Sequence, residues 1–145
     1  MACFLVDGST WKTTLDALDD AKCREIRRRM VENGAKVLIK EMQQTIENRH
    51  HVISGSMRND VAAGEIKEDL DGTSISVWPQ GYDSRGVSNE MKAKYIINGR
   101  RNAFSGRKTA KADNFLNDKF RKKCEPRIFA VMNETFNICM DELNK

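Results

Sequence analysis

Residues 66–79 have the sequence IKEDLDGTSISVWP, and this stretch decides the fold. Its central Asp71-Gly72 pair is the strongest short-range hairpin signal in the chain, because both residues tolerate the positive φ that a tight hairpin turn requires. Segments 66–70 and 73–79 are therefore predicted to be paired antiparallel strands. In the second strand, the side chains at positions 74, 76 and 78 face one way, and Ile75 and Val77 face the other.

A long helical pattern precedes the hairpin. From Leu15 onward, apolar residues recur at steps of three and four, which predicts about thirty helical residues with one face toward a core. Gly34 interrupts this pattern and predicts a bend there, or two helices. After it, Ser54 or Ser56 is placed to cap a short helix that ends near Val61.

The second half of the chain continues with less regular segments. Residues 93–99 predict a further strand or a helical turn, and the polar, basic segment 99–112 predicts a mobile loop. Pro126 fits the first turn of a final helix. Its predicted buried stripe consists of Ile128, Val131, Met132, Thr135, Ile138 and Leu143. Together these elements predict one α+β domain over residues 1–145, with long N-terminal helices and C-terminal helices packed on a small, mostly antiparallel β-sheet.

The composition fits one soluble domain. The chain has 145 residues, of which 39% are hydrophobic and 32% charged, and this excludes fibrous and disordered classes. No run approaches the ~18 apolar residues of a membrane helix, and the first residues lack the basic flank of a signal peptide, so no membrane partner and no export are expected. The four cysteines form no Cys-x-x-Cys pair, so reduced thiols and no metal site are expected.

Positive charge is concentrated late in the sequence. Residues 73–145 carry 14 Lys or Arg and 8 Asp or Glu, a net of +6, against +4 for the whole chain. Eleven of these bases lie between Lys92 and Lys123, with only two acids among them. Such a segment either contacts a polyanion or is a solvated surface, and the sequence leaves both interpretations open.

The residue pattern favours a protein without catalysis or cofactor. His50-His51 is the only histidine site, and adjacent residues point in different directions, which favours solvated turn residues over a shared catalytic role. A hydrolase built on Ser54 and His50 is the weakest alternative, since the glycine pattern of a nucleophile elbow is missing. Gly99 and Gly106 belong to no phosphate-binding loop.

Several short motifs, in their order and spacing, resemble the tail-component or tail-completion (head–tail joining) family of long-tailed double-stranded DNA bacteriophages. The first is a Ser-Gly-x-Met-Arg motif. The second is an aromatic and aliphatic pair that leads to a glycine before a variable loop. The third is an aromatic-Leu pair after that loop. The residues that carry the resemblance are Ser54, Gly55, Met57, Arg58, Tyr95, Gly99, Phe115 and Leu116. The chain departs from the usual family pattern at Asn98 and at Asn114.

The resemblance implies a structural protein of the virion, made in the host cytoplasm, that completes the tail and joins it to the head connector. It would act as a homo-oligomeric ring, commonly a hexamer, with a channel for DNA, and contact tail-tube or terminator proteins and head-connector proteins. The expected DNA-channel or docking residues are Arg100, Arg101, Arg107, Lys108 and Lys111. The candidate subunit-interface residues are Trp11, Trp78, Phe104, Phe129 and Phe136.

A second interpretation is a small cytoplasmic nucleic-acid-binding protein that uses the basic segment 92–123. It predicts binding to duplex DNA that weakens steeply as salt rises. The neck interpretation predicts association with copies of the chain or with tail proteins.

Overall fold

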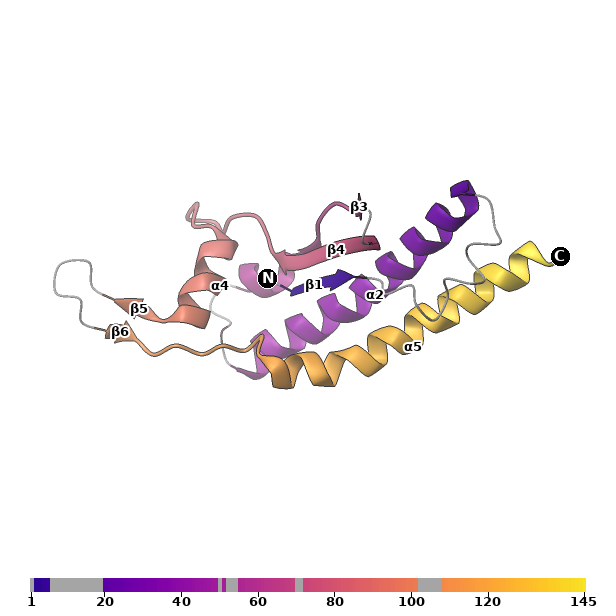
Figure 1. Ribbon diagram of the computed structural model, residues 1–145. Coiled ribbons are helices and arrows are strands. Elements are labelled where there is room, and N and C mark those ends of the chain that lie inside the picture. Colours follow the sequence, from indigo (N-terminus) through magenta and orange to yellow (C-terminus); the bar gives the residue numbers. More distant parts are fainter. Residues whose placement is uncertain (1, 6–19, 50, 52–54, 70–71, 102–107) are drawn as a thin grey trace.

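The structure is a computed structural model that describes residues 2–5, 20–49, 51, 55–69, 72–101 and 108–145. Two long helices and a small sheet form its body (Figure 1). The helices are α2 (Asp20–Asn48) and α5 (Asp118–Leu143). They run antiparallel, since Arg29 contacts Glu142, Asn33 contacts Thr135, and Glu41 contacts Arg127. The α+β prediction is confirmed.

Helix α2 is one uninterrupted helix, so of the two alternatives predicted at Gly34, that of two helices is wrong. The reason lies in the packing of the two helices: a Cβ atom on Gly34 would lie 3.1 Å from Ile128 Cγ2 and 3.3 Å from Met132 Cγ. The missing side chain lets α5 approach α2 closely, and the packing of Ile128 and Met132 offsets the helix propensity that glycine lacks. Gly34 therefore lies at the contact between α2 and α5.

Helix α5 begins eight residues before Pro126, so that the proline lies inside the helix and the predicted start is wrong. The Asn117 side chain caps the helix by accepting a hydrogen bond from the backbone N–H of Phe120 at 3.1 Å. Pro126 removes the hydrogen bond that would end on the Lys122 carbonyl. Both residues are exposed, so water can reach that carbonyl, while Cys124 and Ile128 are buried.

The buried face of α5 differs from the predicted stripe at its C-terminal end. Ile128, Met132 and Thr135 are buried as expected, but Ile138 is 46% exposed and Leu143 is 37% exposed. Cys139 takes the buried position in this part of the helix. Positions 128, 132, 135 and 139 follow one helical face, and position 138 lies about 100° away from 139, beyond the contact with α2.

The sheet is built around β4 (Gly72–Pro79). Strand β1 (Ala2–Leu5) pairs antiparallel with one edge of β4. Strands β2 (Val61–Ala63) and β3 (Lys67–Asp69) pair antiparallel with the other edge. The β3–β4 register places Asp69 opposite Gly72, which confirms the predicted hairpin.

The two faces of β4 also follow the prediction. Ile75 and Val77 are buried in the core that α2 covers, and Ser74 and Ser76 on the opposite face are half-buried. Trp78, on the same face as the two serines, is nevertheless only 7% exposed.

Two short helices join the sheet to the rest of the chain. Helix α3 (Ser56–Asn59) starts after Gly55, whose φ of 79° is left-handed, and no side chain caps it. The predicted serine cap is therefore wrong for Ser56, and Ser54 lies outside the described residues. The predicted helix end near Val61 is also too late, because Val61 opens β2. Residues 93–99 fall largely in α4 (Asn89–Asn98), so of the two predicted alternatives the helical one is correct.

Candidate assembly surface

A basic hairpin extends beyond the body of the molecule (Figure 1). Strands β5 (Arg100–Arg101) and β6 (Lys108–Ala110) pair antiparallel, so the segment 99–112, predicted to be a loop, contains a two-stranded ladder. We call residues 99–112 the basic arm. Of its five predicted site residues, Lys111 is exposed and Arg107 lies outside the described residues. For the other three the structure describes only the backbone.

The base of the basic arm is held by Asp113. Its backbone N–H donates to the Ile96 carbonyl at 2.7 Å, which ties the end of the arm to α4. Its carboxylate contacts His51 Nε2 at 2.8 Å and accepts from Arg49 Nη1 at 3.2 Å, which ties it to the end of α2. His51 is half-buried in this contact, so the prediction of a solvated turn residue is wrong for it. His50 lies outside the described residues.

The described residues that carry the family resemblance have different positions in the fold. Phe115 is 1% exposed, and its ring centroid lies 5.8 Å from that of His51. Met57 is buried, and Leu116 packs against the core. Gly99 ends α4 with a φ of 76°, a backbone conformation that favours glycine. Arg58 is on the surface and pairs with Glu47 at 3.5 Å.

Buried Asn89 joins α4 to α3 and to the end of β4. Its side chain is fully buried, and its Nδ2 lies 2.7 Å from the Gln80 carbonyl oxygen, 3.0 Å from Asp60 Oδ2 and 3.1 Å from Ser56 Oγ. The two N–H groups of the amide are shared among these three acceptors. These bonds set the position of α4 relative to the sheet. Asn89 was not among the residues expected to matter from the sequence, because no sequence signal marks it as buried.

Exposed apolar side chains lie on one face of α4 and in the loop before it. Met91 and Tyr95 are 49% and 46% exposed, and their spacing of four residues places them along one side of the helix. Val87, in the loop before α4, is 43% exposed. Tyr82, in the preceding loop, is 71% exposed. Clusters of exposed apolar side chains mark interaction surfaces more often than scattered ones do. Of these four residues, only Tyr95 was singled out by the sequence, through its place in a motif.

The predicted interface residues have different positions. Phe129 is 41% exposed and remains available for a contact. Phe136 packs against the core, and Trp78 is buried, so neither presents an open surface as predicted. Their periodicity alone could not separate core packing from an interface. Trp11 and Phe104 lie outside the described residues.

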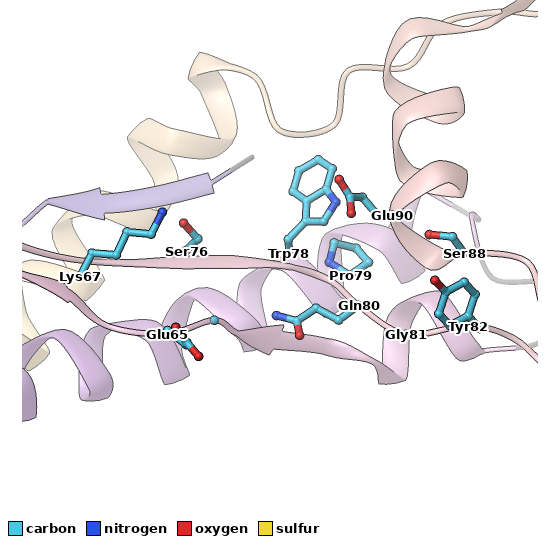
Figure 2. A pocket seen from close by; sticks show the side chains of 11 residues that line it. Glu65, Lys67, Ser76, Trp78, Pro79, Gln80, Gly81, Tyr82, Ser88 and Glu90 are labelled. Carbon is cyan, nitrogen blue, oxygen red and sulfur yellow. The ribbon is translucent and has the colours of Figure 1, made fainter.

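A groove of about 520 Å³ lies beside Trp78, on the face of the sheet away from α2 (Figure 2). Glu65 and Lys67 line one side, and Tyr82, Ser88 and Glu90 line the other. Neither histidine nor cysteine is among the described residues that line the groove.

Asp83 fixes the loop that carries Tyr82 and Val87. Its carboxylate accepts from the Lys92 ammonium and from the backbone N–H groups of Val87 and Arg85, the last two at 2.9 Å. The hydrogen bond from Lys92 is the largest cause that lowers the pKa of Asp83, followed by the Val87 N–H, and the value falls to about 2. The loop thus depends on an ionised carboxylate.

Acid is expected to release this loop. Because the folded pKa of Asp83 lies below its unfolded value near 3.8, the stabilisation is complete above about pH 4 and is lost as the pH falls toward 2. The ¹³C shift of the Asp83 carboxyl and the amide shift of Val87 should titrate together near pH 2. Asp83→Asn should abolish this titration of the Val87 amide. A wild-type midpoint near pH 4 would contradict the assignment.

Exposed lysines continue the positive charge from the basic arm onto α5. Lys111, Lys119 and Lys122 are exposed and have no ion-pair partner among the described residues. Lys123 and Arg127, further along α5, are instead held by the buried Glu41. The unpaired lysines could contact phosphate groups without reading a base sequence.

No protein-family model, curated protein or solved structure matches the chain. The positions of its own residues are therefore the basis for a proposed function. Within the described part of the chain, no group of three or more His, Cys, Asp or Glu residues is arranged to hold a metal ion. In the same part, every helix is too short or too polar to cross a membrane.

Proposed function

We propose that this protein is a non-enzymatic structural protein of a bacteriophage or prophage neck, which completes the tail and joins it to the head connector. It would act in the virion as a homo-oligomeric ring around a channel for DNA, without a cofactor. The resemblance of its motifs to the tail-completion family supports this proposal. Its partners would be tail-tube or terminator proteins and head-connector proteins.

One observation carries the proposal: a basic arm and an exposed apolar helix face lie at the same end of an elongated body (Figure 1). A ring forms when two different surfaces of one subunit fit each other, so a small subunit needs contact residues outside its own core. Val87, Met91 and Tyr95 provide apolar contact area, and strands β5 and β6 extend beyond the body.

Light scattering and negative-stain images of the purified protein, from low to high micromolar concentration, test the ring. We expect a concentration-dependent large species with a central hole. Reversing arm charges with Arg100→Glu, Arg101→Glu and Arg107→Glu should abolish this species without lowering the melting temperature of the monomer. In a phage that encodes this chain, the same variant should reduce infectious particles.

The matched control is a triple reversal at exposed bases on other surfaces, Arg24→Glu, Lys40→Glu and Lys67→Glu, which should leave rings and particle yield unchanged. A normal particle yield from the arm variant would contradict the proposed role of the arm. A protein that stays monomeric, both alone and with tail proteins, would contradict the proposed ring.

A second candidate function, binding of nucleic acid by the basic segment 92–123, is favoured by the unpaired Lys111, Lys119 and Lys122. It predicts that the monomer binds duplex DNA and that log K falls linearly with log salt, with a slope of about −0.9 for each phosphate contacted. Replacing the three lysines with alanine should then reduce the slope by about 3. DNA binding without self-association would favour this function over the neck assignment.

A further inference from the structure

Two Asn-Gly pairs occur in the sequence, Asn33-Gly34 and Asn98-Gly99. In such a pair the backbone nitrogen of the glycine can attack the side-chain carbonyl carbon of the asparagine, because glycine has no side chain to obstruct the approach. This reaction is one reason why asparagine is a thermolabile residue. The two pairs have the same local sequence, so any difference in their reactivity in the folded protein comes from the structure.

The first pair is held inside helix α2. Asn33 Nδ2 donates to Thr135 Oγ1 at 2.9 Å, and Asn33 Oδ1 accepts from Lys36 Nζ at 3.4 Å, so both ends of its side-chain amide are held. Gly34 is buried against α5, and its backbone N–H lies in the interior of an uninterrupted helix. The attack on Asn33 would require this turn of the helix to open, which also opens its contact with α5.

The second pair lies at a helix end. Asn98 is the last residue of α4 and is exposed, and its side chain has no hydrogen-bond partner among the described residues. Gly99 lies outside the helix, with a φ of 76° and a ψ of 171°, where the chain leads into β5 (Figure 1). The last turn of a helix opens at a small cost in free energy, so the backbone at Asn98 is free to rotate into the geometry of attack.

We propose that Asn98 is a site of spontaneous covalent modification, at which asparagine is converted to aspartate and isoaspartate. The Gly99 nitrogen forms a bond to Asn98 Cγ, and the bond from Cγ to Nδ2 breaks. The departing amide group takes the proton of the Gly99 N–H and leaves as ammonia, which gives a five-membered cyclic imide. Water then opens the imide at either of its two carbonyl carbons. One opening gives aspartate, and the other gives isoaspartate, in which the main chain runs through the side-chain carbon.

The product alters the root of the basic arm. Either form adds a carboxylate directly before the arm, and isoaspartate also adds one methylene group to the main chain at this point. The Ile96 carbonyl, two residues earlier, accepts from the Asp113 N–H at 2.7 Å and so ties the end of the arm to α4. We expect the longer main chain to weaken this hydrogen bond. The reaction depends on local geometry alone and proceeds whether or not the protein forms rings.

Mass spectrometry of proteolytic peptides, after incubation of the folded protein at physiological temperature, measures the conversion at both pairs. Each converted peptide gains the mass difference between an OH and an NH₂ group, and chromatography separates its two isomers. Asn98 should convert at least about tenfold faster than Asn33, because only the second pair is free of a helix interior. Conversion of Asn98 should be faster at mildly alkaline than at mildly acidic pH, since the Gly99 nitrogen must lose its proton.

Two controls isolate the cause. In concentrated urea the fold no longer protects Asn33, so both pairs should convert at similar rates. Asn98→Gln lengthens the side chain by one methylene group and prevents the five-membered ring, so its peptide should stay unmodified. Asn98→Asp adds the charge while keeping the normal main chain. The Asp113 amide shift in incubated wild-type protein, compared with that in Asn98→Asp, therefore reports the inserted methylene group alone.

The outcomes decide both parts of the proposal. Conversion confined to Asn98 in the folded protein, and found at both pairs in urea, supports the modification site. Equal rates at the two pairs in the folded protein overturn it, as does an Asn98 that converts only in urea. A change in the Asp113 amide shift that appears with isoaspartate and is missing in Asn98→Asp supports the effect on the arm. An unchanged shift in converted protein overturns that effect.

Discussion

Gly34→Leu is expected to lower the free energy of unfolding by about 3 kcal/mol, because an added side chain must enter the contact between α2 and α5. A Cβ atom alone would lie 3.1 Å from Ile128 Cγ2 and 3.3 Å from Met132 Cγ, closer than ordinary van der Waals contact. Both neighbours are buried at about 1% exposure or less, so they have little room to move. Chemical denaturation with urea measures the loss.

Two further variants identify the cause of this loss. Gly34→Ala gains about 1 kcal/mol of helix propensity and loses a similar amount to crowding, so its net change should be small. In the double variant Gly34→Leu/Ile128→Ala, the leucine fills space that the isoleucine leaves. The two changes should therefore be less costly together than their sum, by at least about 1 kcal/mol. Strict additivity would show that Gly34 does not face Ile128.

Removing both cations from Glu41, with Lys123→Ala/Arg127→Ala, is expected to lower the free energy of unfolding by about 3 kcal/mol. The Glu41 side chain on α2 is only 7% exposed, and its carboxylate pairs with Arg127 and lies 3.4 Å from Lys123 Nζ. Without these partners, a buried carboxylate keeps its desolvation cost and loses its compensation. Alanine has a higher helix propensity than either residue, so helix propensity cannot cause the loss. Thermal and urea unfolding measure it.

The reverse substitution gives the control. Glu41→Met removes the buried charge and leaves two cations that can be hydrated at the surface, so it should cost less than about 1 kcal/mol. Adding Glu41→Met to the double variant should recover most of the lost stability. If Glu41→Met costs as much as the removal of both cations, the ion pairs stabilise the fold by direct attraction and the explanation by desolvation is wrong.

The local elements of the fold could be read from the sequence where a single residue type forces one conformation. Asp71-Gly72 predicted the β3–β4 hairpin, and the alternation along β4 predicted that Ile75 and Val77 face the core. The prediction failed where long-range packing decides the outcome. Gly34 and Pro126 both lie inside helices, because the facing helix buries their neighbours and compensates for their poor helix propensity.

The residues of the candidate assembly surface were harder to predict from the sequence than the fold. The positive charge of the basic arm was visible as composition, since charge does not depend on the fold. The apolar face of α4 was not, because Met91 and Tyr95 have the same periodicity whether a helix face is buried or exposed. Likewise, Ile138 continues the apolar pattern of α5 but lies on a side of the helix that does not contact α2, next to the buried Cys139.

The sequence by itself thus determined the α+β class, the hairpin at residues 66–79 and the basic segment, which follow from turn chemistry, alternation and charge. The tertiary structure alone decided that Glu41 and Asn89 are buried and that Asp113 ties the end of the basic arm to α2. The physical reason is that burial and position depend on residues distant in the chain, whereas local conformation depends mainly on adjacent ones.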